Sequence, residues 1–457
     1  MSPARIGVVG GGLAGMAAAL AAADGGAKVV LFERRPVLGG LTASIRHNGL
    51  SLDNGQHVFL RCCSAYREFI DRIGATDQVF LQRRLDVPVL APDGSRASIN
   101  RSALPAPLHM VGSLGRYRHL SVGERMRLAR PALALRRLDP HDASLDSISF
   151  GDWLADHGQS KRAVERLWNL IALPTLNVSA EEASLALATK VFRVGLLDRS
   201  DGGDIGWSRV PLAELHGAIA ARALEVAGVE TVLAGPVGTV GRSAAGAFTV
   251  SSGERSVVVD AVILATPLHV SASIGASIGS FAGAREAQRL GTSPIVNVHL
   301  VLDRKVTDLP LAACVGSPVQ FVFDRTVASG AKSGQCLVIS LSAADSYIAR
   351  GSPELVSLFL EALRDLFPAA RQARLVDAIV TREKAATFRA VPGTGALRPP
   401  TETEVPGVFL AGAWCDTGWP ATMEGAVRSG RQAASQALAL LSGTAVEHPR
   451  QLEGAGT

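Results

Sequence analysis

A glycine-rich turn between an apolar strand and an alanine-rich helix constrains the possible fold of this chain more than any other feature. Three glycines follow the apolar run Ile6–Val9 and open the small-residue stretch Leu13–Ala23, which is typical of a helix. Glycines at this spacing let the backbone approach a pyrophosphate, and the start of the helix offers it free N–H groups. The predicted diphosphate-binding residues are Gly10, Gly12, Leu13, Ala14 and Gly15.

A second apolar run, Lys28–Phe32, follows the helix and ends at Glu33, about 20 residues beyond the glycines. An acid at this position accepts a hydrogen bond from a ribose hydroxyl, which favours an unphosphorylated ribose. Arg34 then leads into Gly39 and Gly40, where a second turn can reach the pyrophosphate from its other side. Strand, turn, helix, strand and acid in this order predict a bound dinucleotide. A membrane span from residue 6 to 23 is disfavoured, because glycines interrupt it.

Two later segments look like further parts of the same nucleotide-binding domain. The run Ala261–Thr266 is typical of a buried strand ending near a cofactor. Short β runs precede it from Val229 onward, and we assign Val237, the start of the second run, to the cofactor site. The second segment, 408–430, is a buried strand, an acidic loop and a terminal helix. Its predicted cofactor-binding residues are Gly412, Asp416, Thr422, Met423 and Glu424.

The 457 residues, 47% of them hydrophobic, suffice for two or three domains. We predict an α/β fold with a discontinuous Rossmann-like nucleotide domain (1–80, 205–290 and 400–445), into which an α+β substrate domain (81–204 and 291–399) is inserted. A flexible tail, 446–457, follows. Five scattered cysteines show no metal-binding spacing and suit a reducing cytosol, so we expect neither a metal site nor a disulfide framework. No targeting or signal segment is apparent.

Helix and strand signals fill the inserted parts. Capping residues predict helices beginning at Ser121 (with Glu124), at Ser149 and at Ser179 (with Glu182), the last of these running to about residue 195. Pro211 and Ser352 open two more. Four runs predict a second sheet: Ile295–Leu302, Val319–Phe323, Cys336–Leu341 and Ile379–Lys384.

Positive charge is concentrated between Pro105 and Leu138, where seven arginines are interleaved with apolar residues and face a single acid, Glu124. Such a segment can lie on an anionic membrane surface. An ordinary solvated helix face with a packing side remains the alternative. Nucleic-acid binding is disfavoured, because no aromatic stacking residues accompany the arginines.

The nucleotide-binding segments together resemble the FAD-dependent amine oxidase and phytoene desaturase superfamily over almost the whole chain. Four segments narrow the resemblance to its squalene-associated branch, the hydroxysqualene dehydroxylases of bacterial hopanoid and squalene synthesis. They are 53–59 (DNGQHVF), 167–177 (LWNLIALPTLN), 204–216 (DIGWSRVPLAELH) and 412–426 (GAWCDTGWPATMEGA).

The resemblance implies FAD, first reduced by an external donor, and loss of an allylic hydroxyl from hydroxysqualene with gain of hydride to give squalene. NADPH and a partner reductase both stay open as donors. Protonation would make the leaving group water. His57 is our first candidate for the acid because its ordinary pKa is near 6.5. A packed histidine beside the flavin is the alternative. Asp53 is either its orienting partner or a structural acid, and Gln56 completes the predicted catalytic set.

The substrate is a long apolar isoprenoid, so we expect an apolar tunnel whose mouth lies in the Pro105–Leu138 segment. Predicted lining residues are Trp168, Asn169, Trp207 and Trp419, with ordinary helix core as the alternative for the first two. We expect a cytoplasmic enzyme peripheral to the inner membrane, in contact with upstream squalene-pathway enzymes. Three other functions stay open: an oxidative carotenoid desaturase, an amine oxidase, and a prenyl-lipid carrier that lacks flavin.

Overall fold

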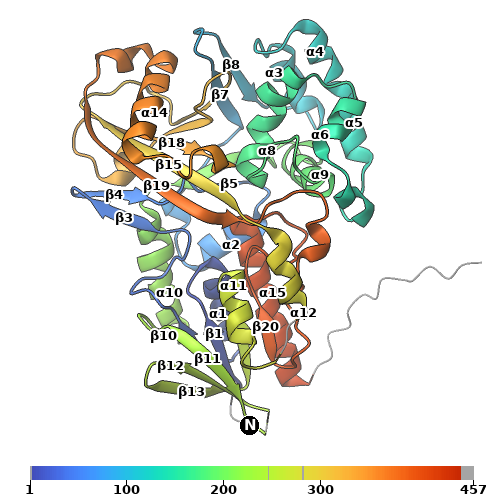
Figure 1. The fold of residues 1–457 in the computed structure, drawn as a ribbon, viewed down its shortest axis with the longest axis vertical. Coiled ribbons are helices and arrows are strands. Elements are labelled where there is room, and N and C mark those ends of the chain that lie inside the picture. Colours follow the sequence, from blue (N-terminus) through green and yellow to red (C-terminus); the bar gives the residue numbers. More distant parts are fainter. Residues whose placement is uncertain (1–2, 245, 280–281, 444–457) are drawn as a thin grey trace, which may run out of the picture.

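The computed structural model describes residues 3–244, 246–279 and 282–443, so the predicted tail 446–457 lies outside the described residues. Two lobes lie one above the other in Figure 1. The lower lobe surrounds a parallel sheet, and the upper lobe joins a mixed sheet to a layer of helices. This is the predicted arrangement of a Rossmann-like domain and a second α+β domain.

The lower lobe is built on a five-stranded parallel sheet whose strands come from three distant parts of the chain. Its β2 has the predicted bounds, and β1 begins one residue earlier than predicted. Both faces of the sheet are covered, which explains why its strands are almost uniformly apolar. In spatial order the strands are β10 (Glu230–Val232), β2 (Lys28–Phe32), β1 (Arg5–Val9), β14 (Ala261–Leu264) and β20 (Val408–Leu410).

Helices α1 (Leu13–Asp24) and α15 (Met423–Ser442) lie side by side on one face of this sheet (Figure 1). The two helices approach closely because Gly430 has no side chain: a Cβ there would lie 2.1 Å from the Ala14 carbonyl oxygen. The other helices of the lobe are α2 (Ser64–Arg72), α10 (Ala220–Val226) with the π-helical turn Ala213–Ile219 before it, α11 (Leu268–Gly275) and α12 (Ala282–Ala287).

A three-stranded antiparallel sheet covers the opposite face and forms the lower tip in Figure 1. Its apolar side chains share a buried cluster with Val9, Val30 and Leu264 of the parallel sheet. The strands are β11 (Val237–Arg242), β12 (Phe248–Ser252) and β13 (Arg255–Val259).

The upper lobe contains a seven-stranded mixed sheet, which includes the four strands predicted between residues 295 and 384. Helix α14 (Ser352–Leu366) covers one face of it, with Leu355, Phe359 and Leu363 fully buried. In order the strands are β19 (Leu375–Thr387), β15 (Ser293–Leu302), β18 (Gln335–Leu341), β17 (Phe321–Asp324), β16 (Leu311–Cys314), β7 (Asp86–Leu90) and β8 (Arg96–Asn100).

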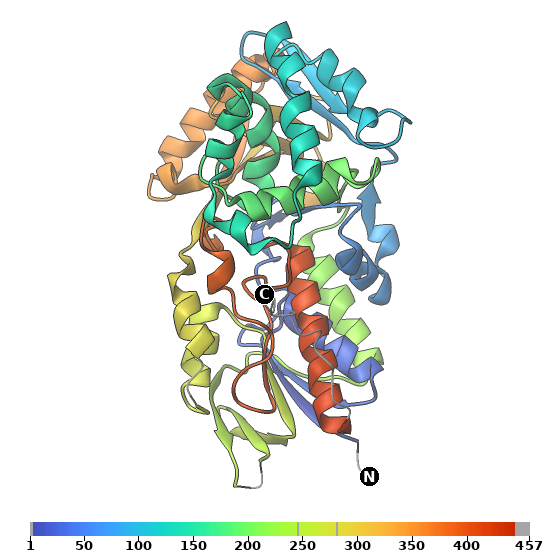
Figure 2. The ribbon, with the colours of Figure 1, turned by 90° about the vertical axis from the view of Figure 1, so that its right-hand side faces the viewer.

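A layer of short helices completes the upper lobe (Figure 2). The helix predicted from Ser179 to about residue 195 is present, but its predicted start is wrong: α9 begins at Leu185, six residues later, and a π-helical turn continues it to Leu197. The Ser179 carbonyl accepts from Glu182 and Ala183 in a tight turn, and the Asn169 side chain takes the Ala180 N–H. The layer comprises α3 (Val111–Gly115), α4 (Val122–Arg127), α5 (Ala129–Arg137), α6 (Phe150–Asp156), α7 (Lys161–Ala163), α8 (Asn169–Leu176) and α9 (Leu185–Phe192).

Small sheets lie near the junction of the lobes. Hairpin β3 (Ser44–His47) and β4 (Leu50–Asp53) reaches the upper sheet, where Asn297 and Thr381 donate to the Asn54 carbonyl. Strands β5 (Val58–Leu60), β9 (Ile205–Ser208) and β6 (Val79–Leu81) form another sheet. Helix α13 (Thr326–Ser329) contacts β4. Within the described ranges, no helix combines the length and apolarity needed to cross a bilayer.

Candidate active site

Two glycine turns face each other at the carboxyl end of β1. A Cβ on Gly40 would lie 2.9 Å from the Gly12 Cα, whereas a Cβ on Gly12 would meet only the Gly40 Cα, at 3.8 Å. Gly12 precedes α1, whose first turn has neither a side-chain cap nor an acidic residue. The start of this buried helix thus presents N–H groups and a positive dipole end that no side chain neutralises. This cradle fits a diphosphate.

Gly10 and Gly15 have a different task from Gly12. Gly10 adopts a φ of +111°, and a Cβ on Gly15 would lie 1.8 Å from the Gly10 carbonyl oxygen. These two glycines let the helix pack against the end of the strand. Leu13 and Ala14, also predicted at the diphosphate, form the first residues of α1 and are buried.

Glu33 lies at the carboxyl end of β2 and is buried. Its carboxylate accepts from the Gly11 N–H at 2.7 Å and from the Arg35 N–H at 2.8 Å. A carboxylate has about four acceptor positions, so two remain for ribose hydroxyls. Arg34 is exposed, and the guanidinium that spans the second turn belongs instead to Arg35, which donates to the Gly40 carbonyl at 3.1 Å.

Val237, the half-buried first residue of β11, follows a segment that is attached to the same corner. The Ala234 N–H donates to the Arg35 carbonyl and the Gly235 N–H to the Glu33 carbonyl, both at 2.9 Å. The chain around Val237 is therefore close to Glu33, although the two are about 200 residues apart in sequence.

The C-terminal segment approaches the cradle through the loop between β20 and α15. The Gly412 N–H donates to Ser429, and Asp416 is exposed and accepts from the Gly418 N–H at 3.0 Å. Thr422 caps α15 by accepting from the Gly425 N–H. Met423 is the half-buried first residue of that helix.

The Glu424 side chain turns away from the cradle. It is buried, accepts from the N–H groups of Ala65 and Tyr66 at the start of α2, and pairs with Arg428 at 2.7 Å. Only its backbone remains available to a cofactor.

The predicted catalytic residues line a cavity of about 10 Å³, enough for roughly one water molecule. Asp53, Gln56 and His57 come from β4 and the loop after it, and Trp207 comes from β9. The Nε2 atom of Gln56 is buried and has no hydrogen-bond partner among the described residues. The apolar part of the wall includes Val58, Leu212 and Phe323.

Asp53 forms a buried ion pair with Arg325, at 2.8 Å. Its other oxygen accepts from the Leu212 N–H at 2.9 Å and the Ser44 hydroxyl at 2.7 Å. Arg325 also donates to the Ser208 carbonyl at 2.6 Å. These contacts engage both oxygens of Asp53, and they favour its structural role over that of a partner for His57.

His57 is half-buried because one side of the ring faces the cavity. Burial lowers the pKa of His57 below its ordinary value, and the nearby Asp53 carboxylate and Leu41 carbonyl only partly oppose this effect. Arg325 adds to the lowering. The His57 ring is therefore mostly neutral at neutral pH. The sequence analysis, which uses the ordinary pKa of histidine, predicts a larger protonated fraction.

Two further histidines are buried in this region: His216, which sequence analysis places in a segment of the family resemblance without a catalytic role, and His299, which it missed. Burial lowers the pKa of His216 to about 3 and that of His299 to about 4. His216 Nε2 lies 2.9 Å from the Tyr66 hydroxyl, and neither ring nitrogen of His299 has a partner among the described residues. The isolated His299 in an apolar strand gave no sequence signal, because its polar neighbours come from distant segments.

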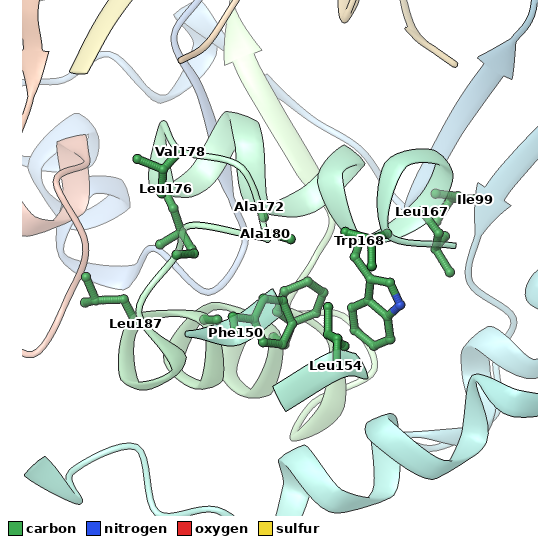
Figure 3. Close-up of a cluster of buried hydrophobic side chains, with 14 of the residues drawn as sticks. Ile99, Phe150, Leu154, Leu167, Trp168, Ala172, Leu176, Val178, Ala180 and Leu187 are labelled. Atoms are coloured by element: carbon green, nitrogen blue, oxygen red, sulfur yellow. The ribbon is translucent and has the colours of Figure 1, made fainter. Parts of the chain in front are cut away.

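The predicted substrate residues fall into different surroundings. Figure 3 shows Trp168 within the apolar cluster of the upper lobe, beside Phe150 and Leu154. Its indole N–H donates to Gln159 at 3.1 Å. Asn169 holds the Ala180 N–H at 2.7 Å. Both therefore stabilise the fold in the structure, which favours the core alternative for them.

The other two tryptophans are half-buried. Trp207 stacks on Phe80 with ring centres 4.6 Å apart and faces the cavity. Trp419 lies between two cations, with Lys190 Nζ at 5.5 Å and the Arg428 guanidinium at 4.9 Å from the ring centre. Trp414, which sequence analysis did not select, donates to the Thr266 carbonyl at 3.2 Å and so links the middle and last parts of the lower lobe.

The arrangement can bind a dinucleotide at one end and transfer a proton at the other. Within the described residues, no group of three or more His, Cys, Asp or Glu side chains could hold a metal ion, and the five cysteines are free.

Comparison with known proteins agrees with this geometry. A family model described as flavin containing amine oxidoreductase matches residues 13–438. Hydroxysqualene dehydroxylase of Zymomonas mobilis is 26% identical, over 94% of this chain and 98% of that protein. A probable zeta-carotene desaturase of Synechococcus elongatus is 24% identical, over 95% and 98%. Cyclohexylamine oxidase from Brevibacterium oxydans has the same fold, with a TM-score of 0.71 and 19% identity over 96% of this chain and all of that one.

Proposed function

Because this chain belongs to the family of flavin-containing amine oxidoreductases, we propose that it is a FAD-dependent hydroxysqualene dehydroxylase. The substrate is the allylic alcohol hydroxysqualene, and the products are squalene and water. Reduced FAD, when bound, supplies a hydride and is oxidised by two electrons. An external donor, NADPH or a reductase, restores it. Support comes from the similarity to the Zymomonas mobilis enzyme over nearly both full lengths.

The residues of this chain supply the proton and the surroundings of the reaction. The carbon–oxygen bond breaks as the hydroxyl oxygen takes a proton and leaves as water, and the hydride then bonds to the allylic carbon. In its protonated form, the minor form at neutral pH, His57 donates the proton from a ring nitrogen, and Gln56 Nε2 is free to orient the hydroxyl oxygen. The apolar wall of Val58, Trp207 and Phe323 excludes water that would compete for the cation.

One observation supports this proposal most directly: the titratable ring of His57 lies beside an apolar wall at the junction of the lobes. A proton donor there serves a reaction that must expel hydroxide from an apolar alcohol. Since burial lowers the pKa of His57, the donating step should slow as the pH rises through a value below 6.5.

Product analysis tests the proposal. Purified protein, chemically reduced under anaerobic conditions, is incubated with hydroxysqualene, and the products are separated by gas chromatography. We expect squalene, and we expect His57→Gln to lower kcat by about 100-fold. His141→Gln, at an exposed histidine, is the matched control. Absence of squalene with fully loaded and reduced protein would overturn the proposal.

An oxidative carotenoid desaturase is the second candidate, because the Synechococcus elongatus desaturase is almost as similar as the dehydroxylase. Hydride would then pass from the substrate to oxidised FAD, the neighbouring carbon would lose a proton to a base or to water, and no acid would be required. Oxidised protein incubated with zeta-carotene and an electron acceptor distinguishes the two. A more conjugated product that His57→Gln still forms would favour the desaturase.

A further inference from the structure

The helices that carry the arginine-rich segment have two apolar faces, only one of which is used by the fold. Leu128 lies between α4 and α5 with right-handed helical backbone angles, so the two helices form a nearly continuous run from Val122 to Arg137. Leu128, Pro131 and Leu135 point inward and are buried. Leu128 and Leu135 join the apolar cluster that also contains Phe150 and Trp168.

The outward face of the same run is also apolar. Val122 is 66% exposed, Met126 76% and Leu133 50%, and Ala129 is exposed between them. At about 100° per residue these four positions fall within roughly 60° of one another on the helix, opposite the buried residues. Their spacing of four, three and four residues makes a continuous stripe.

Arginines flank this stripe on both sides. Arg130 and Arg137 fall on one side of it, and Arg136 falls on the other. All three are exposed, and none forms an ion pair with a carboxylate in the described part of the chain. The single acid of the segment, Glu124, accepts instead from Ser121 and Ser160.

The chain before this run also exposes apolar side chains. Leu104, Leu108 and Val111, which lie before and at the start of α3, are more than half exposed, and Arg125 joins α4 to the end of α3 through the Gly115 carbonyl at 2.5 Å. Helices α3 to α5 form an upper corner of the molecule, far from the lower tip (Figures 1 and 2).

We propose that this face, the α4–α5 stripe with its flanking arginines, binds an anionic phospholipid bilayer, with Val122, Met126 and Leu133 inserted among the acyl chains. Apolar side chains bordered by unpaired arginines match the chemistry of that surface, since the headgroups are negative and the layer beneath them is apolar. An acidic protein would satisfy the arginines but would need a shaped apolar recess for each protruding side chain. The inference is independent of the proposed reaction.

Vesicle flotation with the full-length protein tests this surface. We expect binding to vesicles of equal parts phosphatidylglycerol and phosphatidylcholine, weaker binding at high salt, and little binding to phosphatidylcholine alone. The apolar variant is Val122→Gln/Met126→Gln/Leu133→Gln, and the charge variant is Arg130→Glu/Arg136→Glu/Arg137→Glu. Each should lower the partition coefficient by at least about tenfold.

Helix α10 offers a matched control, because Arg222 and the 82% exposed Val226 lie one turn apart on its surface. Arg222→Glu/Val226→Gln should bind vesicles like the unchanged protein. Thermal unfolding and flavin content of every variant show whether it has folded, and neither readout depends on the reaction catalysed.

A second measurement locates the contact. In Leu133→Trp, lipids brominated in the acyl chains should quench the new indole, and the same change at Val226 should give no quenching. Equal binding by the apolar variant, or binding that neither salt nor lipid charge affects, would overturn the proposal. Loss of binding in the charge variant alone, without quenching at residue 133, would show that the arginines bind lipid headgroups by charge only and would overturn insertion of the apolar stripe.

Discussion

The two ends of the candidate site are held by different kinds of interaction. At the diphosphate end, Gly12, Gly40 and the start of α1 form a cradle from residues close in sequence. At the His57 end, the geometry depends on the pair of Asp53 and Arg325, which are 272 residues apart. A ligand that approaches the backbone requires glycines at a fixed spacing, and this spacing can be recognised in a sequence. A buried catalytic group requires charged partners from distant segments, and a sequence does not show which segments meet.

The largest expected effect is at the diphosphate end, where one substitution tests whether Gly12 is needed for cofactor binding or for folding. In Gly12→Leu the new side chain enters the space between the two glycine turns, where the protein alone leaves room. We expect a folded protein that retains no flavin, measured by absorbance after purification, and whose Tm equals that of the flavin-free unchanged protein. Gly241→Leu, at an exposed glycine with no neighbour within 4 Å, should retain flavin. Flavin retention in the first variant would contradict the cradle.

Breaking the long-range pair is the corresponding test at the other end. Arg325→Met leaves Asp53 as a buried, unpaired carboxylate, so it should lower the free energy of unfolding by about 3–5 kcal/mol. Denaturant titration measures the change. Asp53→Asn/Arg325→Met should recover part of the loss, because no unpaired charge remains. Equal destabilisation by the single and double variants would show that the ion pair does not hold this end.

Lowering the pH should destabilise the region around His57 and His216 at a higher pH than it destabilises the glycine cradle. Burial lowers the pKa of His216 to about 3, against about 6.5 in the unfolded chain. The unfolded state therefore binds the extra proton, and stability is lost as the pH falls from 6.5 toward 3. For this residue the loss is about 1.5 kcal/mol between pH 6.5 and 5.

His216→Gln checks the contribution, since it removes the titration while leaving the Tyr66 hydroxyl a partner. Unfolding curves at several pH values should show a shallower dependence than in His141→Gln, whose site is exposed. An unchanged slope would mean that His216 is not titrated on unfolding.

The smallest expected effect comes from a purely local interaction away from both ends. Ser121 accepts from the Glu124 N–H, and Glu124 accepts from the Ser121 N–H, as the capping box in the sequence predicted. Ser121→Ala should cost about 1 kcal/mol of stability and leave flavin content unchanged. Ser121→Asn should restore most of that loss, and failure to do so would indicate that the hydroxyl bond to the Glu124 side chain matters more than the cap.

The sequence predicted those parts of the fold whose signals are local. Strands β1 and β2, helix α1 and the four strands between 295 and 384 were found from apolar periodicity and turn residues. The Ser179 helix start was wrong because the Asn169 side chain, ten residues earlier, takes a backbone donor there. A capping pattern shows where a turn can begin, but it does not show whether the turn continues as a helix: here the Glu182 and Ala183 N–H groups both donate to the Ser179 carbonyl.

The candidate site, like the fold, was predictable only where its residues carry a signal in their own segment. Asp53, Gln56, His57 and Trp207 were selected through a family resemblance, and the structure places them around one cavity. Arg325 was not selected, since nothing in its own segment indicates a carboxylate 272 residues earlier. The roles assigned to these residues in cofactor binding and catalysis stay predictions.

The contact between Gly430 and Ala14 has a consequence for how the protein is made. Helix α15 packs on α1, so the N-terminal nucleotide-binding unit is covered by the last helix of the described chain. During translation the glycine turns leave the ribosome more than 400 residues before this helix is complete. Helix α1 must therefore wait for the end of synthesis before its outer face is buried, and a product that stops short of residue 423 would leave that face exposed.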